Sequence, residues 1–303
     1  MNVINHITSN PLQKRVLAVN DFSCFGKCSL NVAIAILTSF NIETVGLPTA
    51  LLSTHTGGFE GYSFRPLTDE MRDIIAHLES EGLKADVIYS GYMCGKEQID
   101  LMDRIIDSFA RKDTKILIDP VMGDGGALYS NFDMDYVERM KKLCARADII
   151  TPNVTEAALL TDMTVDEIET DRKGIEICLD RLLLLGCRKI VITGVRGDRV
   201  KDKSGDMSFD SPTVGYVGID GDRGEKIGEY YPYVDACLHG CGDVFASRLC
   251  AEIAGGKSDF KNAVHEAAEF TERGILRAIQ LHPAHWYGLP FEEELDISRK
   301  NQF

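Results

Sequence analysis

The stretch LHGCGDVFASRLCAE, residues 238 to 252, joins a tight turn to a strong helical pattern and places an aspartate at the junction. Gly240 and Gly242 permit close backbone approaches that a Cβ would obstruct, so the amides around Cys241 can converge on one anion. Asp243 falls at the expected helix start, where exposed N–H groups and the helix dipole favour negative charge. Its carboxylate could there accept a proton from an attacking hydroxyl. Taken alone, the stretch is better explained by an ordinary Asp N-cap after a glycine turn.

The composition is that of an ordinary globular protein, with 303 residues of which 44% are hydrophobic and 26% charged. We expect a single domain over residues 1–303, with a peripheral leader at 1–14 and an exposed tail at 290–303. A formal net charge of −14, with only 33 Lys and Arg, argues against a nucleic-acid partner, because proteins that follow a phosphate backbone carry a basic surface. Any phosphate must therefore be bound locally.

Nine cysteines are present, an odd number in a long chain, and most lie in apolar periodic stretches. This pattern indicates reduced thiols rather than a disulfide framework, and the spacings do not fit a structural zinc site. The N-terminal segment lacks a basic and apolar signal pattern, and no apolar run is long enough to cross a membrane. The sequence therefore predicts a cytoplasmic protein without a membrane partner.

Short apolar runs alternate with helical patterns along most of the chain, which predicts an α/β fold. The expected strands are 15–19, 86–90, 115–119, 148–151 and 189–194, and the expected helices are 30–40, 68–83, 96–110, 133–144, a short one from 154, 172–185, 243–254 and 260–280. Pro48 argues against a central strand in the middle of 42–52. TVGYVGI and GEYYPYV flank a turn-rich segment and predict an antiparallel hairpin. We expect a mainly parallel central sheet with helices on both faces and this hairpin near one end.

Polar residues gather directly after the predicted strands. They are Asn20 and Asp21, then Asp119 and Asp124, then Thr151, Asn153 and Glu156, and finally Thr193 and Gly194. Ligands of an open parallel sheet bind at the carboxyl ends of its strands, so we expect these side chains to share one rim. Several carboxylates on one rim are tolerated when a divalent cation and a polyphosphate offset their repulsion.

Each of these motifs also has a purely structural explanation. Asn153 and Glu156 match a helix capping box, and His55 could hydrogen-bond within its own loop, STHTGG. Cys241 is better explained as a small packing residue than as a nucleophile, since no neighbouring base activates it. Neither GxxxxGK[ST] nor GxGxxG is present, so the sequence supports neither a P-loop ATPase nor the usual dinucleotide site.

Taken together, the motifs FGKCSLNVAIAIL, LLSTHTGGF, SGY at 90–92, DPVMGD at 119–124, ADIITPNVTEAALL, VITG and HGCGDVFAS resemble the ribokinase-like superfamily, specifically its pyridoxal (vitamin B6) kinase branch. The resemblance covers most of the chain. It implies a single-domain α/β fold, usually a homodimer, that transfers the γ-phosphoryl group of ATP to the 5′-hydroxymethyl group of pyridoxal, pyridoxine or pyridoxamine. ATP and Mg²⁺ are the implied cofactors, with K⁺ left open.

The resemblance also implies roles for individual residues. Asp243 corresponds to the catalytic base, and Gly240, Cys241 and Gly242 to the anion hole. The implied nucleotide and metal site consists of Asp119, Asp124, Tyr129, Thr151, Asn153, Thr193 and Gly194, with Glu156 and Asp124 toward the metal. The implied pyridine pocket consists of Asp21, His55, Thr56 and Tyr92.

Three departures from the family pattern bear on specificity. The usual GTGD is GCGD here, which removes a hydroxyl but keeps the backbone amides and the aspartate. Asp21 aligns with a serine of many pyridoxal kinases, and Thr54 stands where several relatives have Asn. The alternative functions are a hydroxymethylpyrimidine kinase of thiamin synthesis, a sugar kinase as a weaker rival, and a non-catalytic vitamer- or nucleotide-binding regulator.

Overall fold

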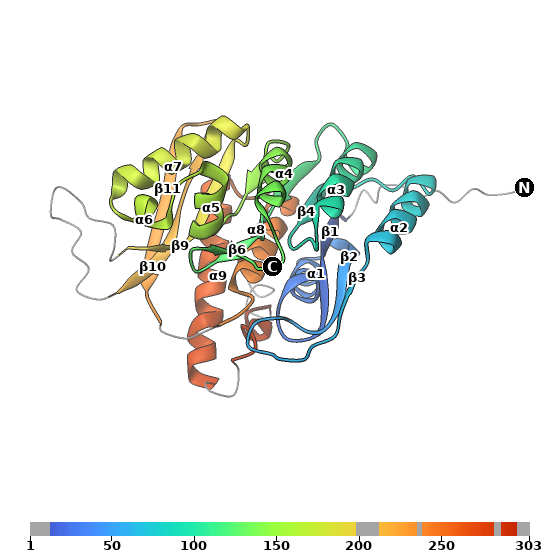
Figure 1. Ribbon diagram of the computed structural model, residues 1–303, viewed down its shortest axis with the longest axis horizontal. Helices are drawn as coiled ribbons and strands as arrows, with labels where there is room; N and C mark the ends of the chain where they lie inside the picture. Colours follow the sequence, from blue (N-terminus) through green and yellow to red (C-terminus); the bar gives the residue numbers. More distant parts are fainter. Residues whose placement is uncertain (1–12, 198–211, 235–237, 282–285, 296–303) are drawn as a thin grey trace, which may run out of the picture.

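The computed structural model describes residues 13–197, 212–234, 238–281 and 286–295, which form a nine-stranded sheet with helices around it (Figure 1). The strand order is β11-β10-β9-β8-β5-β4-β1-β2-β3. The strands are β1 (Arg15–Phe25), β2 (Glu43–Thr54), β3 (Phe64–Pro66), β4 (Val87–Ser90), β5 (Lys115–Ile118), β8 (Ile149–Ile150), β9 (Lys189–Arg196), β10 (Thr213–Asp220) and β11 (Glu225–Pro232). The predicted fold class is confirmed: β9, β8, β5, β4, β1 and β2 run parallel, and the β10–β11 hairpin continues the sheet antiparallel.

Alternate residues of β1 pack on opposite faces of the sheet, which gives the molecule two hydrophobic layers. Leu17 and Val19 join one cluster, which includes side chains of α2 (Thr68–Ser80), α3 (Lys96–Phe109), α4 (Met134–Cys144), α5 (Val154–Thr161) and α7 (Arg172–Leu185). Val16 and Ala18 join the other, with α1 (Ser29–Ser39), α8 (Cys241–Gly255) and α9 (Phe260–Leu281). Helices therefore cover both faces, as expected for a buried parallel sheet.

Four local features differ from the sequence-based expectations. The first strand extends to Phe25 through a register irregularity between Asn20 and Phe22, so Asn20 and Asp21 lie within β1 rather than after it. Pro48 lies inside β2, where its missing N–H is tolerated because β3 pairs with β2 only from Ala50 to Leu52. A small hairpin, β6 (Gly123–Asp124) with β7 (Ala127–Leu128), and the short helix α6 (Val165–Glu169) were not predicted.

The expectation of an exposed C-terminal tail is wrong for its first residues. Phe291 of the tail is buried, together with Leu289 just before it, against α1, α8 and α9 in a third hydrophobic cluster. Lys27 pairs with Glu292, and Arg273 donates to Glu294 at 2.6 Å, so both ionic and apolar contacts hold this segment. Residues 1–12 of the expected leader and 296–303 of the tail lie outside the described residues. None of the described helices is long and apolar enough to cross a membrane.

Candidate active site

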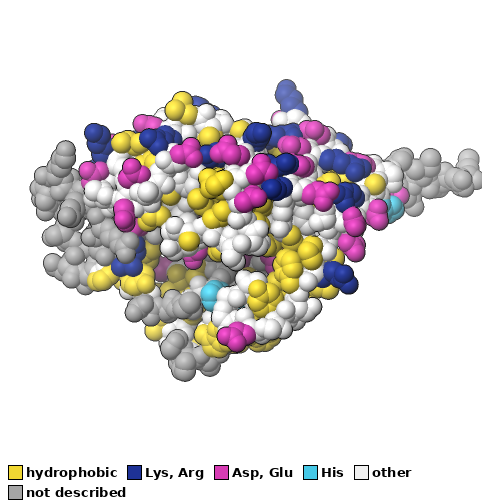
Figure 2. Space-filling model, in the orientation of Figure 1, with side chains coloured by type: hydrophobic (Ala, Val, Ile, Leu, Met, Phe, Trp, Pro, Cys, Tyr) yellow, Lys and Arg dark blue, Asp and Glu magenta, His cyan; other side chains and the backbone are white. Residues whose placement is uncertain are grey.

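A cavity of about 770 Å³ opens at the carboxyl ends of the parallel strands. Figure 2 shows the hollow on this face of the molecule, with acidic side chains visible inside it. Fifteen of the sixteen residues predicted for the site line this cavity: Asp21, His55, Thr56, Tyr92, Asp119, Asp124, Tyr129, Thr151, Asn153, Glu156, Thr193, Gly240, Cys241, Gly242 and Asp243. Gly194 does not line it, although it directly follows Thr193 in β9.

The turn before α8 needs a glycine at its start. Gly240 has φ 82°, and a Cβ at this position would lie 1.9 Å from the carbonyl oxygen of Lys27. Gly240 is the N-cap of α8, and the helix begins at Cys241, two residues earlier than predicted. Asp243 therefore lies in the first helical turn, so the simple explanation of this residue as an N-cap is wrong.

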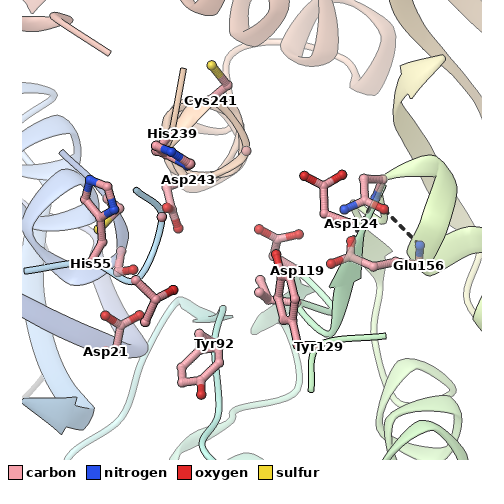
Figure 3. Close-up of a pocket in the computed structure, with 18 of the residues that line it drawn as sticks. Asp21, His55, Tyr92, Asp119, Asp124, Tyr129, Glu156, His239, Cys241 and Asp243 are labelled. Atoms are coloured by element: carbon pink, nitrogen blue, oxygen red, sulfur yellow. Dashed lines mark hydrogen bonds between the residues drawn. The ribbon is translucent and has the colours of Figure 1, made fainter. Parts of the chain in front are cut away.

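The carboxylate of Asp243 faces the centre of the cavity (Figure 3). Its surroundings raise its pKa to about 7, chiefly because protein replaces solvent around it, and the charge of Asp21 adds to the effect. The backbone amide of Ser29 and the side-chain amide of Asn20, whose Nδ2 lies 3.4 Å from Oδ1, act in the opposite direction. A carboxylate with a pKa near neutrality is suited to accept a proton from a hydroxyl.

Asp119 and Glu156 lie across the cavity from the α8 turn (Figure 3). Burial and the charge of Asp243 raise the pKa of Asp119 to about 8, although Thr151 Oγ1 donates to its carboxylate at 3.2 Å. Burial and the charge of Asp119 raise the pKa of Glu156 well above its ordinary value. This cluster of carboxylates is costly unless a positive charge offsets it.

The capping explanation for Asn153 is confirmed, and the same residue also lines the cavity. Its Oδ1 accepts from the Glu156 backbone N–H at 2.8 Å, and its Nδ2 donates to the Gly123 carbonyl at 2.9 Å. Glu156 accepts from the backbone N–H groups of Asn153 at 2.8 Å and Met122 at 3.1 Å. The cap therefore fixes the start of α5 against the β6–β7 hairpin at the rim.

A divalent cation suits the donor set on this side. No three His, Cys, Asp or Glu side chains among the described residues are placed to hold a metal by themselves. Mg²⁺, however, commonly uses only one or two carboxylates and completes its octahedron with phosphate oxygens and water. Both carboxylate oxygens of Glu156 already accept backbone N–H groups, so Asp119 and Asp124 are better placed to contribute direct oxygen ligands.

The other end of the cavity combines rings with hydrogen-bonding groups. The Asp21 carboxylate accepts from Ser23 Oγ at 3.2 Å, and burial raises its pKa. His55 Nε2 lies 2.8 Å from the Tyr287 carbonyl oxygen, and Asn131 Nδ2 donates to the Tyr92 hydroxyl at 3.1 Å. This end can hold a small flat ring with polar substituents.

Sequence reasoning missed several residues that line the cavity. The most informative are Tyr62, Phe64, Asn131 and His239. Tyr62 lies between the STHTGG loop and β3, which begins at Phe64, and His239 directly precedes the Gly240 turn. Proximity to these two motifs was the available signal.

Comparisons with known proteins agree with this geometry. A family model described as phosphomethylpyrimidine kinase matches residues 37–288. A pyridoxine kinase from Bacillus subtilis is 30% identical, covering 71% of this chain and 72% of its own, and a hydroxymethylpyrimidine/phosphomethylpyrimidine kinase from the same organism is 25% identical, covering 84% and 85%.

A crystal structure from Bacteroides thetaiotaomicron, of a candidate phosphomethylpyrimidine kinase, is 32% identical with a TM-score of 0.86 over 95% of this chain and 94% of its own. A second crystal form of that protein, with a TM-score of 0.84, contains pyridoxal. The family match over most of the chain and the 30% identity to a pyridoxine kinase confirm the resemblance found in the motifs. The chain belongs to the phosphomethylpyrimidine kinase family of ribokinase-like proteins, alongside vitamin B6 kinases.

Proposed function

We propose that this kinase transfers the γ-phosphoryl group of ATP to the 5′-hydroxymethyl group of a B6 vitamer: pyridoxal, pyridoxine or pyridoxamine. The observation that carries the proposal is the position of Asp243 in the first turn of α8. Its carboxylate, with a pKa of about 7, faces a cavity that has ring-binding groups at one end and buried carboxylates at the other.

In this mechanism the chain aligns the reactants and stabilises charge. Asp243 accepts the proton of the acceptor hydroxyl. The N–H groups around Gly240, Cys241 and Gly242, at the positive end of α8, stabilise the migrating phosphoryl group. Asp119 and Asp124 would hold Mg²⁺, whose charge would offset negative charge on the phosphates. The nucleotide is contacted by Thr151, Asn153, Thr193 and Tyr129, with Gly194 next to Thr193 in β9. Glu156 organises the rim of the nucleotide site.

Two observations favour a B6 vitamer as the acceptor. The related Bacteroides thetaiotaomicron protein was crystallised with pyridoxal, and a pyridoxine kinase is among the relatives at 30% identity. Asp21, His55, Thr56 and Tyr92 supply the polar contacts that a substituted pyridine requires at the ring-binding end.

A second candidate acceptor is hydroxymethylpyrimidine, free or as its phosphate. The family model and the 25% identical Bacillus subtilis enzyme favour it. Both candidates are aromatic rings that carry a hydroxymethyl group, so the same base and anion hole would serve either one.

A coupled assay of ADP release separates the candidates when it is run with pyridoxal, pyridoxine, pyridoxamine, hydroxymethylpyrimidine and its phosphate. Phosphorylated product is measured in parallel. Preferential turnover of a B6 vitamer supports the proposal, and preferential turnover of a pyrimidine replaces it with the second candidate. Binding of nucleotide and vitamer without product would instead indicate a regulator.

Light scattering tests the predicted homodimer, and replacing K⁺ by tetramethylammonium tests a K⁺ requirement.

A further inference from the structure

His239 occupies a position between the two functional ends of the cavity. It directly precedes Gly240, whose φ of 82° and contact with Lys27 fix the course of the chain into α8. Its side chain lines the cavity next to Asp243 and faces His55 (Figure 3). No role follows for His239 from the sequence motifs or from the proposed transfer step.

The imidazole of His239 touches the loop that carries His55 and Thr56. Its ring centroid lies 5.0 Å from that of His55, at an interplanar angle of 45°. A Cβ on Gly57 would lie 2.3 Å from Cε1 of His239. The backbone of this loop therefore rests directly on the His239 ring, and a Cβ at position 57 would displace that ring.

His55 is also held by contacts other than the one with His239. The two packed rings therefore connect the turn before α8 to the segments that hold His55. His55 Nε2 lies 2.8 Å from the Tyr287 carbonyl oxygen, and a carbonyl can only accept, so His55 donates from Nε2. Phe59 packs edge-on against the His55 ring at 4.9 Å. Burial and the neighbouring His55 lower the pKa of His239, which favours an uncharged, packed ring.

We infer that His239 is a positioning residue that sets the distance between the acceptor loop, 55–57, and the anion-hole turn, 240–242. Ring packing, rather than proton transfer, carries this role. The inference rests on the proposed kinase function, because it concerns where the acceptor hydroxyl lies relative to the phosphoryl group. A displacement of about 1 Å in such an alignment can lower a rate by about a hundredfold.

Gly57→Ala is the most direct test, because its Cβ occupies space that the His239 ring holds while the loop backbone needs no positive φ. We expect this variant to lower kcat by about tenfold or more with a smaller change in the KM for the acceptor. More of the ADP released should then arise without phosphorylated acceptor. Gly95→Ala is the matched control, since a Cβ at Gly95 meets no atom within 4 Å, and it should behave as wild type.

A double-mutant cycle distinguishes positioning from a general loss of stability. His239→Ala should lower kcat by itself, and Gly57→Ala should then cost little more, because the ring it collides with is gone. His239→Phe, which keeps an aromatic ring in this place, should retain more activity than His239→Ala.

The outcomes separate this inference from the proposed function. If wild type phosphorylates none of the acceptors, the proposed function fails. The positioning role is wrong if wild type is active but Gly57→Ala lowers kcat by the same factor in wild type and in the His239→Ala variant. It is also wrong if His239→Phe retains no more activity than His239→Ala. Thermal unfolding of every variant checks that the lost activity is not lost fold.

Discussion

The side-chain amide of Asn20 in β1 donates to the carboxylate of Asp243 in α8 across 3.4 Å, although 223 residues separate them in the chain. The carbonyl oxygen of the same side chain accepts from the backbone N–H groups of Asp21 at 3.0 Å and Tyr92 at 2.8 Å. The Asn20 side chain, which is 1% exposed, thus connects the proposed base to Asp21 and Tyr92 at the ring-binding end.

Asn20→Ala should destabilise the protein and slow it. Two backbone N–H groups lose their acceptor, so the free energy of unfolding should fall by about 2 kcal/mol or more in urea titrations. Asn20→Asp keeps the accepting oxygen but places a second carboxylate against Asp243. Asn20→Asp should therefore lower turnover more than it lowers the free energy of unfolding. If the two variants lost the same turnover and the same stability, this account would be contradicted.

Asp243→Asn should lower turnover by at least about a hundredfold while the fold and nucleotide binding persist, because only the proton acceptor is removed. Steady-state kinetics and nucleotide titration by calorimetry measure the two effects. Asp73→Asn, an exposed position on α2, serves as the control. Near-normal turnover of Asp243→Asn would rule out its role as the base.

Asp119 should make the free protein less stable as the pH rises from about 4 to 8. Its pKa is about 8 in the fold and about 4 in an unfolded chain, so the native state binds more protons in this window. The contribution of protonated Asp119 to the free energy of unfolding is complete below about pH 4 and is lost as the pH rises through 8. In the Asp119→Asn variant, the free energy of unfolding should change less with pH over this range than it does in the wild type. An unchanged slope would show that Asp119 is ionised in the free protein.

Cys241→Thr should change turnover by less than about threefold, since the turn uses the backbone N–H groups of this residue. Burial and the charge of Asp243 raise the pKa of the thiol to about 12, so it is not a thiolate at neutral pH. Sγ donates to the Leu238 carbonyl, at 3.7 Å. A large change in kcat in either direction would assign the side chain a function that its surroundings do not suggest.

The sequence was sufficient to predict which residues meet at the rim wherever a strand simply ends. Asp119 and Thr151 follow β5 and β8, and parallel pairing brings strand ends together regardless of side-chain detail. Asp21 reaches the same cavity, and Asn20 reaches the carboxylate of Asp243, for a different reason, because β1 continues through an irregularity that no local pattern indicates.

Contacts between distant segments could not be predicted. The approach of Gly57 to His239, and the burial of Phe291 against α8 and α9, depend on how loops cross over the finished sheet. Their sequences show only a glycine pair and a short apolar group before an acidic run. The predicted start of α8 was wrong by two residues because Gly240, rather than Asp243, is next to the first helical residue as the N-cap.

The position of β1 between β4 and β2 also bears on the order of events during synthesis. The strand that carries Asn20 leaves the ribosome before the other strands of the sheet, yet α8, which carries Asp243, follows only after more than two hundred further residues. A nascent chain can pair β1 with β2 early, but it has no complete catalytic centre until α8 has emerged. Premature termination anywhere before α8 would therefore yield a chain without the proposed catalytic base, even where every strand of the sheet had already been made.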